Sequence, residues 1–219
     1  MSLEAKNVTF YYRGRKKKPV LKGVNLEIHP GERVGLKAPS GRGKTTLCRL
    51  LAGYEKPKEG EVLLDGRPLG EYKGICPVQM IWQHPELAVD PLLRLKETMK
   101  EVEEPDLAER MESFGIREEW LERFPSELSG GELQRFCLAR ALGKEVRYLL
   151  CDEISAMLDL WNQARIFELL LRETDRRKLG ILIVSHDEAL LERVCTRVES
   201  LEGGNQDAII GDSVLVKNM

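Results

Sequence analysis

Residues 38–46 read Ala38-Pro39-Ser40-Gly41-Arg42-Gly43-Lys44-Thr45-Thr46. A β-type run, Arg33-Val34-Gly35-Leu36, precedes this glycine-rich stretch, and apolar residues at helical spacing follow it. Backbone N–H groups in such a loop converge on phosphate oxygens, helped by the dipole of the following helix. Lys44 would reach the β- and γ-phosphates, and the Thr45 hydroxyl would face Mg²⁺. The stretch therefore predicts a nucleotide-binding loop; a surface Gly/Lys turn is the alternative.

The first position of this loop departs from the usual pattern, because Ala38 stands where the pattern has glycine. Alanine reaches only part of the backbone space that is open to glycine. We therefore expect Ala38 either to use an ordinary φ/ψ region or to carry some strain.

Two adjacent carboxylates, Asp152 and Glu153, end an apolar run that begins at Arg147. Ligands in α/β folds sit at the carboxyl edge of the sheet, where such a run ends. Because Mg²⁺ prefers carboxylates and retained waters, we predict that Asp152 holds the metal through water. Glu153 would then polarise an attacking water. Two acids that cap a strand in solvent are the alternative.

A second glycine pair opens a later helix, in the stretch Leu128-Ser129-Gly130-Gly131-Glu132. The N-terminus of a helix attracts anions. A single nucleotide needs only one phosphate cradle, so the second one suggests that Ser129, Gly130 and Gly131 serve a nucleotide held by another copy. An ordinary Ser-capped helix start is the alternative.

The order of strand-like and helix-like patterns indicates an α/β architecture. Apolar residues at helical spacing dominate residues 92–142 and return in a long amphipathic helix near 160–177. The run at 181–184 is apolar throughout, as in a buried parallel sheet. The other β-type runs are expected at 8–12, 20–28, 33–36, 61–66 and 146–151.

The composition predicts a folded, soluble protein. Of 219 residues, 42% are hydrophobic and 32% charged, which allows a sizeable core. The 34 basic and 36 acidic residues give a net charge of −2, which argues against nucleic-acid binding through bulk charge. No apolar run approaches the roughly 20 residues that span a bilayer, and residues 1–7 lack the apolar core of a secretion signal. We expect a cytosolic protein with small, buried, reduced thiols at Cys48, Cys76, Cys137, Cys151 and Cys195.

Taken together, the motifs resemble those of the nucleotide-binding subunits of ABC transporters, in the right order over essentially the whole chain. Residues 128–132 are similar to the family's LSGGQ signature, with Glu132 in place of Gln. Residues 78–83 resemble the Q-loop, which would make Gln83 the sensor of the metal and of the membrane partner. Residues 184–187 resemble the switch region, in which His186 would contact the γ-phosphate; a histidine of the core or sheet edge is the alternative.

The resemblance extends to two further positions. Ser155-Ala156-Met157-Leu158-Asp159 resembles the D-loop, although it is one residue longer than the usual SALD. We therefore take Asp159 as the candidate for the D-loop aspartate. Tyr12 resembles the aromatic residue that stacks on adenine, and Tyr11 is the second candidate for this role. The basic run at 13–18 follows them, and since it ends at Pro19 between two predicted strands we expect a solvated hairpin turn.

The resemblance implies an ABC-type fold: a P-loop NTPase core with a mainly parallel sheet flanked by helices, an antiparallel β subdomain and a helical signature lobe. We expect one ATP-binding domain over residues 1–219. Its core and antiparallel β lobe would take about 1–83 and 146–219, and its helical lobe about 84–145. The implied cofactors are ATP and Mg²⁺.

The resemblance also implies an ATPase that drives solute transport through separate membrane subunits, on the cytoplasmic face of the cell membrane. Its partners would be a second ATP-binding subunit, transmembrane permease subunits and a solute-binding protein, with no nucleic acid. Gln83-His84-Pro85 with Asp90-Pro91 resembles a segment of dipeptide, oligopeptide and nickel importers, which favours import of such a small solute. The sequence leaves the solute open, and also whether the second ATP-binding subunit is identical.

Two alternatives remain at this point. One is a nucleotide-gated ABC protein of DNA repair or translation, although such relatives carry paired ATPase units, coiled-coil insertions or zinc-binding inserts that this sequence lacks. The other is a partner subunit whose ATP site is degenerate because of Ala38.

Overall fold

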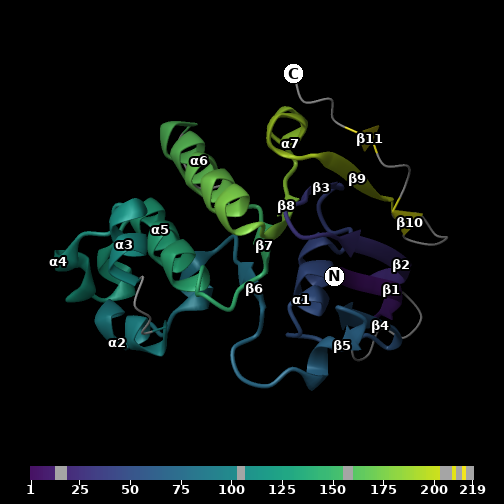
Figure 1. The fold of residues 1–219 in the computed structure, drawn as a ribbon, viewed down its shortest axis with the longest axis horizontal. Helices are drawn as coiled ribbons and strands as arrows, with labels where there is room; N and C mark the ends of the chain where they lie inside the picture. Colours follow the sequence, from purple (N-terminus) through teal and green to yellow (C-terminus); the bar gives the residue numbers. More distant parts are fainter. Residues whose placement is uncertain (13–18, 103–106, 155–159, 203–208, 211–213, 216–219) are drawn as a thin grey trace.

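The computed structural model describes residues 1–12, 19–102, 107–154, 160–202, 209–210 and 214–215. These residues form two β-sheets and a series of helices (Figure 1). The basic run at 13–18 and the D-loop at 155–159, with Asp159, lie outside the described residues. The predictions made for those two segments therefore stay predictions.

An antiparallel sheet forms the amino-terminal part of the molecule, with the strand order β2-β1-β4-β5. Along β2 the buried residues Val24, Leu26 and Ile28 alternate with exposed polar ones, so that one face of the sheet packs inward. The first strand begins at Leu3 rather than at Val8, where the sequence analysis placed its start. The strand bounds are β1 (Leu3–Phe10), β2 (Leu21–Ile28), β4 (Glu59–Leu64) and β5 (Arg67–Pro68).

The second sheet is parallel through its centre, in the order β6-β7-β8-β3-β9. Every residue of β7 and β8 is buried, as in strands that are covered on both faces. Two short strands, β10 (Ile209–Ile210) and β11 (Val214–Leu215), pair antiparallel with β9. The parallel strands are β3 (Arg33–Lys37), β6 (Val78–Ile81), β7 (Tyr148–Asp152), β8 (Gly180–Val184) and β9 (Arg197–Glu202).

The parallel sheet separates two apolar cores, because successive side chains of a strand point to opposite faces. Tyr148 and Leu150 of β7 pack in a core with the antiparallel sheet and α1. Leu149 and Cys151 pack on the other side in a core with α5, α6 and α7 (Figure 1). These helices are α1 (Lys44–Leu51), α5 (Gly130–Ala141), α6 (Leu160–Arg177) and α7 (Glu188–Val194).

Between β6 and β7 the described residues form helices and short turns but no strand. Phe114, Trp120 and Phe136 are buried among these helices, which lie to one side of the parallel sheet in Figure 1. The lobe boundaries at residues 84 and 145 stay a prediction. The remaining helices are α2 (Leu95–Met99), α3 (Leu107–Ser113) and α4 (Glu118–Leu121), with 3-10 turns η1 (Leu69–Glu71), η2 (Pro85–Ala88), η3 (Lys100–Val102) and η4 (Pro125–Glu127).

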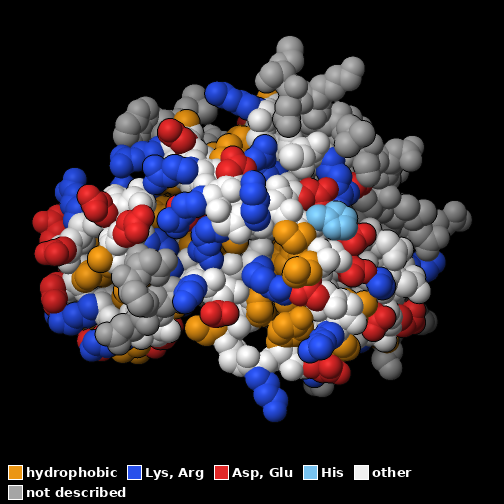
Figure 2. Space-filling model, viewed as in Figure 1, with side chains coloured by type: hydrophobic (Ala, Val, Ile, Leu, Met, Phe, Trp, Pro, Cys, Tyr) orange, Lys and Arg blue, Asp and Glu red, His pale blue; other side chains and the backbone are white. Residues whose placement is uncertain are grey.

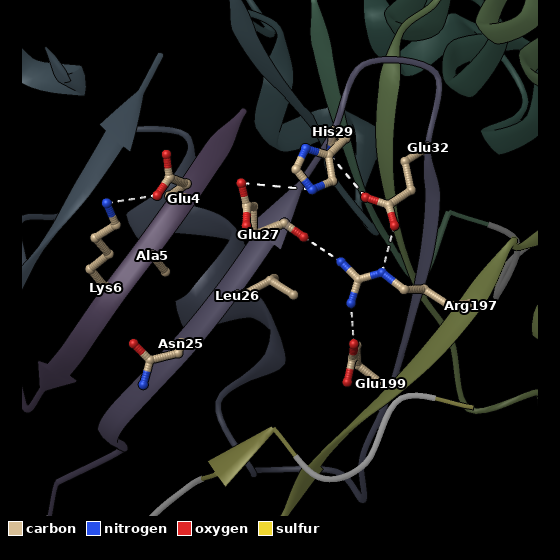
Figure 3. Close-up of a pocket in the computed structure, with 10 residues that line it drawn as sticks. All are labelled: Glu4, Ala5, Lys6, Asn25, Leu26, Glu27, His29, Glu32, Arg197 and Glu199. Atoms are coloured by element: carbon tan, nitrogen blue, oxygen red, sulfur yellow. Dashed lines mark hydrogen bonds and ion pairs between the residues drawn. The ribbon is translucent and has the colours of Figure 1, made fainter. Parts of the chain in front are cut away.

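Arg197 of β9 ties the two sheets together at the amino end of β3. Its Nε donates to Glu32 Oε1 at 2.6 Å, and its other nitrogens contact the Glu199 carboxylate and the backbone carbonyl of Glu27 (Figure 3). The pocket around this guanidinium has a volume of about 440 Å³. Since the phosphate loop leaves the carboxyl end of β3, the pocket lies at the opposite end of that strand.

The observed sheets and helices confirm the α/β class predicted from the sequence. On the face shown in Figure 2, Lys and Arg side chains lie among Asp and Glu side chains over both the helices and the antiparallel sheet. No helix among the described residues is both long and apolar enough to cross a lipid bilayer.

Candidate active site

The glycine-rich loop at residues 38–43 joins the end of β3 to the start of α1. Its residues 39–42 are exposed, so the face that would hold phosphates is open. Gly43 precedes the helix with φ of 93°, and a Cβ there would lie 2.8 Å from Leu21 Cδ2. The left-handed backbone and the close neighbour both require glycine at this position.

Ala38 does not have the left-handed backbone that would require glycine. Among the described non-glycine residues, only Asn7, Asp65, Glu153 and Lys178 have positive φ. Of the two outcomes expected for Ala38, the structure therefore shows the ordinary backbone region. Its carbonyl oxygen accepts a hydrogen bond from Lys44 Nζ at 2.7 Å.

Glu153 lies at the centre of a cluster of predicted catalytic residues, and Lys44 contacts it from the phosphate loop. Lys44 Nζ is 3.4 Å from Glu153 Oε1, and Gln83 Nε2 donates to Glu153 Oε2, also at 3.4 Å. His186 Nδ1 lies 3.9 Å from the same oxygen. The structure thus brings Lys44, Gln83, Glu153 and His186 together at the carboxyl edge of the parallel sheet.

The backbone of Glu153 is strained, with φ of 49°. Its N–H donates to the carbonyl of Val184 at 3.0 Å, which anchors Glu153 to the end of β8. A non-glycine residue in this region costs free energy and occurs often at functional sites, where the surroundings hold it in place. No pattern in the sequence predicts this strain.

Asp152 and Thr45 form the second part of the site. The Asp152 side chain is buried and hydrogen-bonds to the side chain of Thr45. Burial raises the pKa of Asp152, the charge of Glu153 adds to that rise, and the Thr45 hydrogen bond opposes it. A buried carboxylate that is destabilised in this way favours a cation beside it, and a carboxylate with a hydroxyl and the Gln83 amide is an oxygen donor set that suits Mg²⁺.

Tyr12 lies beside the start of α1. Its hydroxyl is 3.2 Å from Thr46 Oγ1, and its ring meets that of Phe10 edge-on, with centroids 5.0 Å apart. Both Tyr12 and Tyr11 are half-buried. The adenine contact assigned to Tyr12 stays a prediction, and Tyr11 is still the second candidate.

The second glycine pair starts α5, as expected. Ser129 precedes the helix, Gly130 and Gly131 form its first turn, and the polar contacts of Ser129 run to Glu132 within the same helix start. Among the described residues, the hydrogen bonds of the Ser129 side chain and N–H join it to Glu132, and none of these bonds runs to the phosphate loop. This placement agrees with a capped helix start. Ser129 and Gly130 are exposed, so another molecule can reach them.

One support of the site was missed in the sequence. The ring of Trp82, which precedes Gln83, meets that of Tyr54 edge-on at a centroid distance of 5.3 Å, and the Arg49 guanidinium lies over the Trp82 ring at 5.2 Å. Aromatic and cationic groups in this arrangement attract each other. The three residues come from separate elements, and their spacing in the sequence gave no signal.

Comparisons with known proteins support the resemblance to ABC transporter subunits that the sequence motifs indicate. The family model described as ABC transporter matches residues 21–156. The nickel import system ATP-binding protein NikE of Staphylococcus aureus is 33% identical over 214 residues, which cover 92% of this chain and 87% of that protein. Two solved structures of the bacterial ABC transporter cassette MJ0796 are 25% identical and cover 99% of this chain and 100% of theirs.

The two cassette structures also show how closely the fold is shared. The dimeric cassette superposes with a TM-score of 0.82, and the dimeric post-hydrolysis state bound to ADP and Pi superposes with 0.81. The family match and the NikE similarity both extend over most of the chain and include the phosphate loop, the Q-loop, the signature and Glu153. The chain therefore belongs to the ABC transporter family, and it is one of the ATPases that form the family's ATP-binding subunits.

Proposed function

We propose that this chain powers import of a small solute, working as one of two ATP-binding subunits beneath separate membrane permeases. The observation that carries the proposal is the convergence of Lys44, Gln83, Glu153 and His186 around one carboxylate. Residues from four separate segments meet there, beside an open phosphate loop. Such a set can hold a triphosphate and direct a water at it.

Binding of ATP starts at the phosphate loop. The backbone N–H groups of residues 40–46 and the N-terminus of α1 attract the phosphates. Lys44 Nζ now contacts the Ala38 carbonyl and Glu153 Oε1, and it would exchange these partners for β- and γ-phosphate oxygens. Tyr12 would support adenine, because it lies next to the same helix start.

Thr45, Asp152 and Gln83 would hold Mg²⁺ together with retained waters. The bound ion would supply charge compensation for the β- and γ-phosphate oxygens. Asp152 contributes the buried negative charge, and the Thr45 hydroxyl, already bonded to that carboxylate, is in reach of the same position.

Hydrolysis depends on Glu153 and His186. Glu153 would accept a hydrogen bond from a water and orient its oxygen toward the γ-phosphorus. The new P–O bond forms as the bond from the γ-phosphorus to the bridging oxygen breaks, a proton of the water passes to the Glu153 carboxylate, and ADP leaves with the bridging oxygen. His186, whose side chain is largely exposed, would donate to a γ-phosphate oxygen.

A second copy, or a similar subunit, would complete each site. Ser129, Gly130 and Gly131 of one protomer would contact the γ-phosphate held by the other, since they form an exposed helix start whose described hydrogen bonds stay within α5. The dimeric cassettes of similar fold support this pairing. ATP would then bind the closed pair more tightly than the open one, which is how a ligand drives a conformational change.

Permeases would dock near the Q-loop. Leu87, Leu92 and Leu93 follow Gln83 in the chain and are exposed by 64%, 81% and 40%. Exposed apolar residues that gather in one segment are typical of interaction sites. A subunit docked there would lie at the membrane's cytoplasmic face, with a solute-binding protein on the other side. The similarity to NikE favours nickel or a comparable small solute.

The catalytic part is tested with Glu153→Gln. This variant should bind MgATP, lose turnover by about 100-fold or more and accumulate as an ATP-bound pair. Glu188→Gln is the matched control, because Glu188 pairs with Lys37 at 3.4 Å on an exposed surface outside the cluster. Normal steady-state hydrolysis by Glu153→Gln would refute the role given to Glu153.

The transport part is tested by co-expression with candidate permease subunits of nickel and dipeptide importers. Uptake of radioactive Ni²⁺ and of a labelled dipeptide is measured in cells, with Glu153→Gln as the inactive reference. Uptake of either solute that requires Glu153 supports the proposal. ATPase activity that no permease alters, with no uptake of either solute, would contradict it and favour the non-transport alternative.

A further inference from the structure

The carboxylate of Glu132 binds both donors of Ser129 within one protomer. The Ser129 N–H donates to Glu132 Oε2 at 2.8 Å, and the Ser129 hydroxyl donates to the same oxygen at 2.8 Å. In return, the Glu132 N–H lies 3.4 Å from Ser129 Oγ. One carboxylate oxygen therefore takes the backbone and side-chain donors at the start of α5.

Ser129 is also a residue that the proposed function assigns to the γ-phosphate held by the partner subunit. A serine hydroxyl has a single proton to donate. While Ser129 donates it to Glu132, only lone pairs of its oxygen face an incoming phosphate. The partner's phosphate can accept that proton only after the Glu132 carboxylate has released it.

Charge makes this competition stronger. The two hydrogen bonds from Ser129 lower the pKa of Glu132, and the positive charges of Arg135 and Arg123 lower it further. Glu132 is therefore negative at neutral pH, whereas the glutamine of the usual signature is neutral. A carboxylate in hydrogen-bond contact with Ser129 repels a phosphate that approaches the same hydroxyl.

We propose that Glu132 is an internal competitor of the nucleotide. Its carboxylate occupies Ser129 in the open protomer, is displaced by the γ-phosphate of ATP on the partner, and so sets the ATP concentration at which the two subunits close. The inference rests on the head-to-tail pairing of the proposed function. Glu132 acts through Ser129, so it is a positioning residue rather than a catalytic one.

The test uses the full chain with the two substitutions Glu132→Gln and Glu153→Gln. The second substitution prevents hydrolysis from dissociating the two subunits. The fraction of dimer is measured by sedimentation over a range of MgATP concentrations. We expect the MgATP concentration at half-maximal pairing to fall at least fivefold relative to the Glu153→Gln parent. The affinity of the separate protomer for MgATP, measured at protein concentrations below pairing, should stay the same, because the described hydrogen bonds of Ser129 stay within its own helix start.

Glu127 provides a matched control. Its Oε2 accepts the Phe124 N–H at 2.7 Å, so it caps the preceding turn as Glu132 caps α5, without contact to Ser129. Glu127→Gln removes the same charge from the same lobe and should leave the pairing curve where it is. Glu132→Ala serves as a second variant, and it should shift the curve in the same direction as Glu132→Gln even though it lacks the cap.

The outcomes separate the two proposals. A parent that binds MgATP but pairs at no concentration refutes the head-to-tail pair, and with it this inference. A parent that pairs, with no shift in Glu132→Gln and Glu132→Ala, refutes the role of Glu132 alone. An equal shift in Glu127→Gln would also overturn it, because the effect would then come from the charge of the lobe rather than from Ser129.

Discussion

Glu153 and Lys44 form an ion pair, with 3.4 Å between Glu153 Oε1 and Lys44 Nζ and only 17% and 7% of their side chains exposed. The lysine that would bind the phosphates is therefore neutralised by the carboxylate that would direct the water. Binding of a triphosphate has to break this pair, since Lys44 turns to the phosphates while Glu153 keeps its charge nearby. The ion pair thus opposes nucleotide binding in the open protomer.

Glu153→Gln should consequently bind ATP more tightly than the natural chain. The glutamine removes both the competing partner of Lys44 and the negative charge beside the phosphates. We expect a gain of about 1 kcal/mol, or roughly fivefold in Kd, measured by calorimetry without Mg²⁺ at a protein concentration below pairing. Glu188→Gln, which breaks the exposed pair with Lys37, should leave Kd unchanged. Equal or weaker binding by Glu153→Gln would show that the pair does not compete with ATP.

Ala38→Gly tests the degenerate-site alternative. Ala38 has an ordinary backbone, so glycine offers the loop no conformation that it needs. We expect the affinity for MgATP to stay within about twofold, while the free energy of unfolding falls by about 0.4–1 kcal/mol because glycine gains freedom in the unfolded chain. A large gain in affinity would instead mean that Ala38 impairs the natural site.

Gly43→Ala, unlike Ala38→Gly, should weaken the binding of MgATP. Its Cβ would lie 2.8 Å from Leu21 Cδ2, so that Leu21 or the phosphate loop has to shift, and a φ of 93° is strained for alanine in either case. We expect MgATP binding to fall by at least tenfold, as measured by nucleotide titration. Gly41→Ala is the matched control, because Gly41 has a similar φ of 77° but no neighbour within 4 Å. If both substitutions weaken binding equally, the contact with Leu21 is not the cause.

The sequence predicted the local parts of this molecule well, since each depends on near neighbours. Helix α6 spans Leu160–Arg177, the range that the amphipathic pattern indicated. Periodicity does not predict the strand Val78–Ile81, because four residues are too few to show a period. The early start of β1 agrees with the sequence, since Leu3 and Ala5 alternate with Glu4 and Lys6 and so extend the β-type pattern before Val8.

The site itself depends on strand order, which periodicity does not reveal. Gln83, Glu153 and His186 each follow a strand, and parallel pairing of β6, β7 and β8 sets the three strand ends side by side. The resemblance to a family supplied that arrangement. What no pattern could supply is the contact chemistry, such as the strained backbone of Glu153 or the Glu132 carboxylate on Ser129.

Alkaline conditions should weaken the fold through its buried thiols. Burial raises the pKa of Cys137 and of Cys195 from 9.0 to about 12, and it raises that of Cys48 and Cys151 as well. In the unfolded chain these thiols ionise near pH 9, whereas in the folded chain they stay protonated. Their stabilising effect is therefore complete below pH 9 and is lost as the pH rises toward 12, by about 1.4 kcal/mol per thiol and pH unit.

Urea unfolding at pH 8, 9 and 10 measures this loss, with reductant present. Cys137→Ala should flatten the fall between pH 9 and 10, whereas Cys76→Ala, at the half-buried thiol, should change it less. A midpoint that stays constant up to pH 10 in the natural chain would contradict the assignment of raised pKa values to the buried thiols.

Arg197 offers a stability test that is separate from the nucleotide site. Burial acts to lower the pKa of Arg197, but Glu32 and Glu199 raise it by more, so the guanidinium stays charged between them. Arg197→Met would leave the Glu199 carboxylate, of which 3% is exposed, without that positive charge. We expect the free energy of unfolding to fall by about 3–5 kcal/mol, measured by urea denaturation. Adding Glu199→Gln and Glu32→Gln should restore part of the lost free energy of unfolding, because these two substitutions remove the uncompensated negative charges.

MgATP binding provides a control for this variant. Since the pocket lies at the end of β3 opposite to the phosphate loop, folded Arg197→Met should still bind MgATP normally. Lost affinity in a folded variant would mean that the two ends of β3 are coupled.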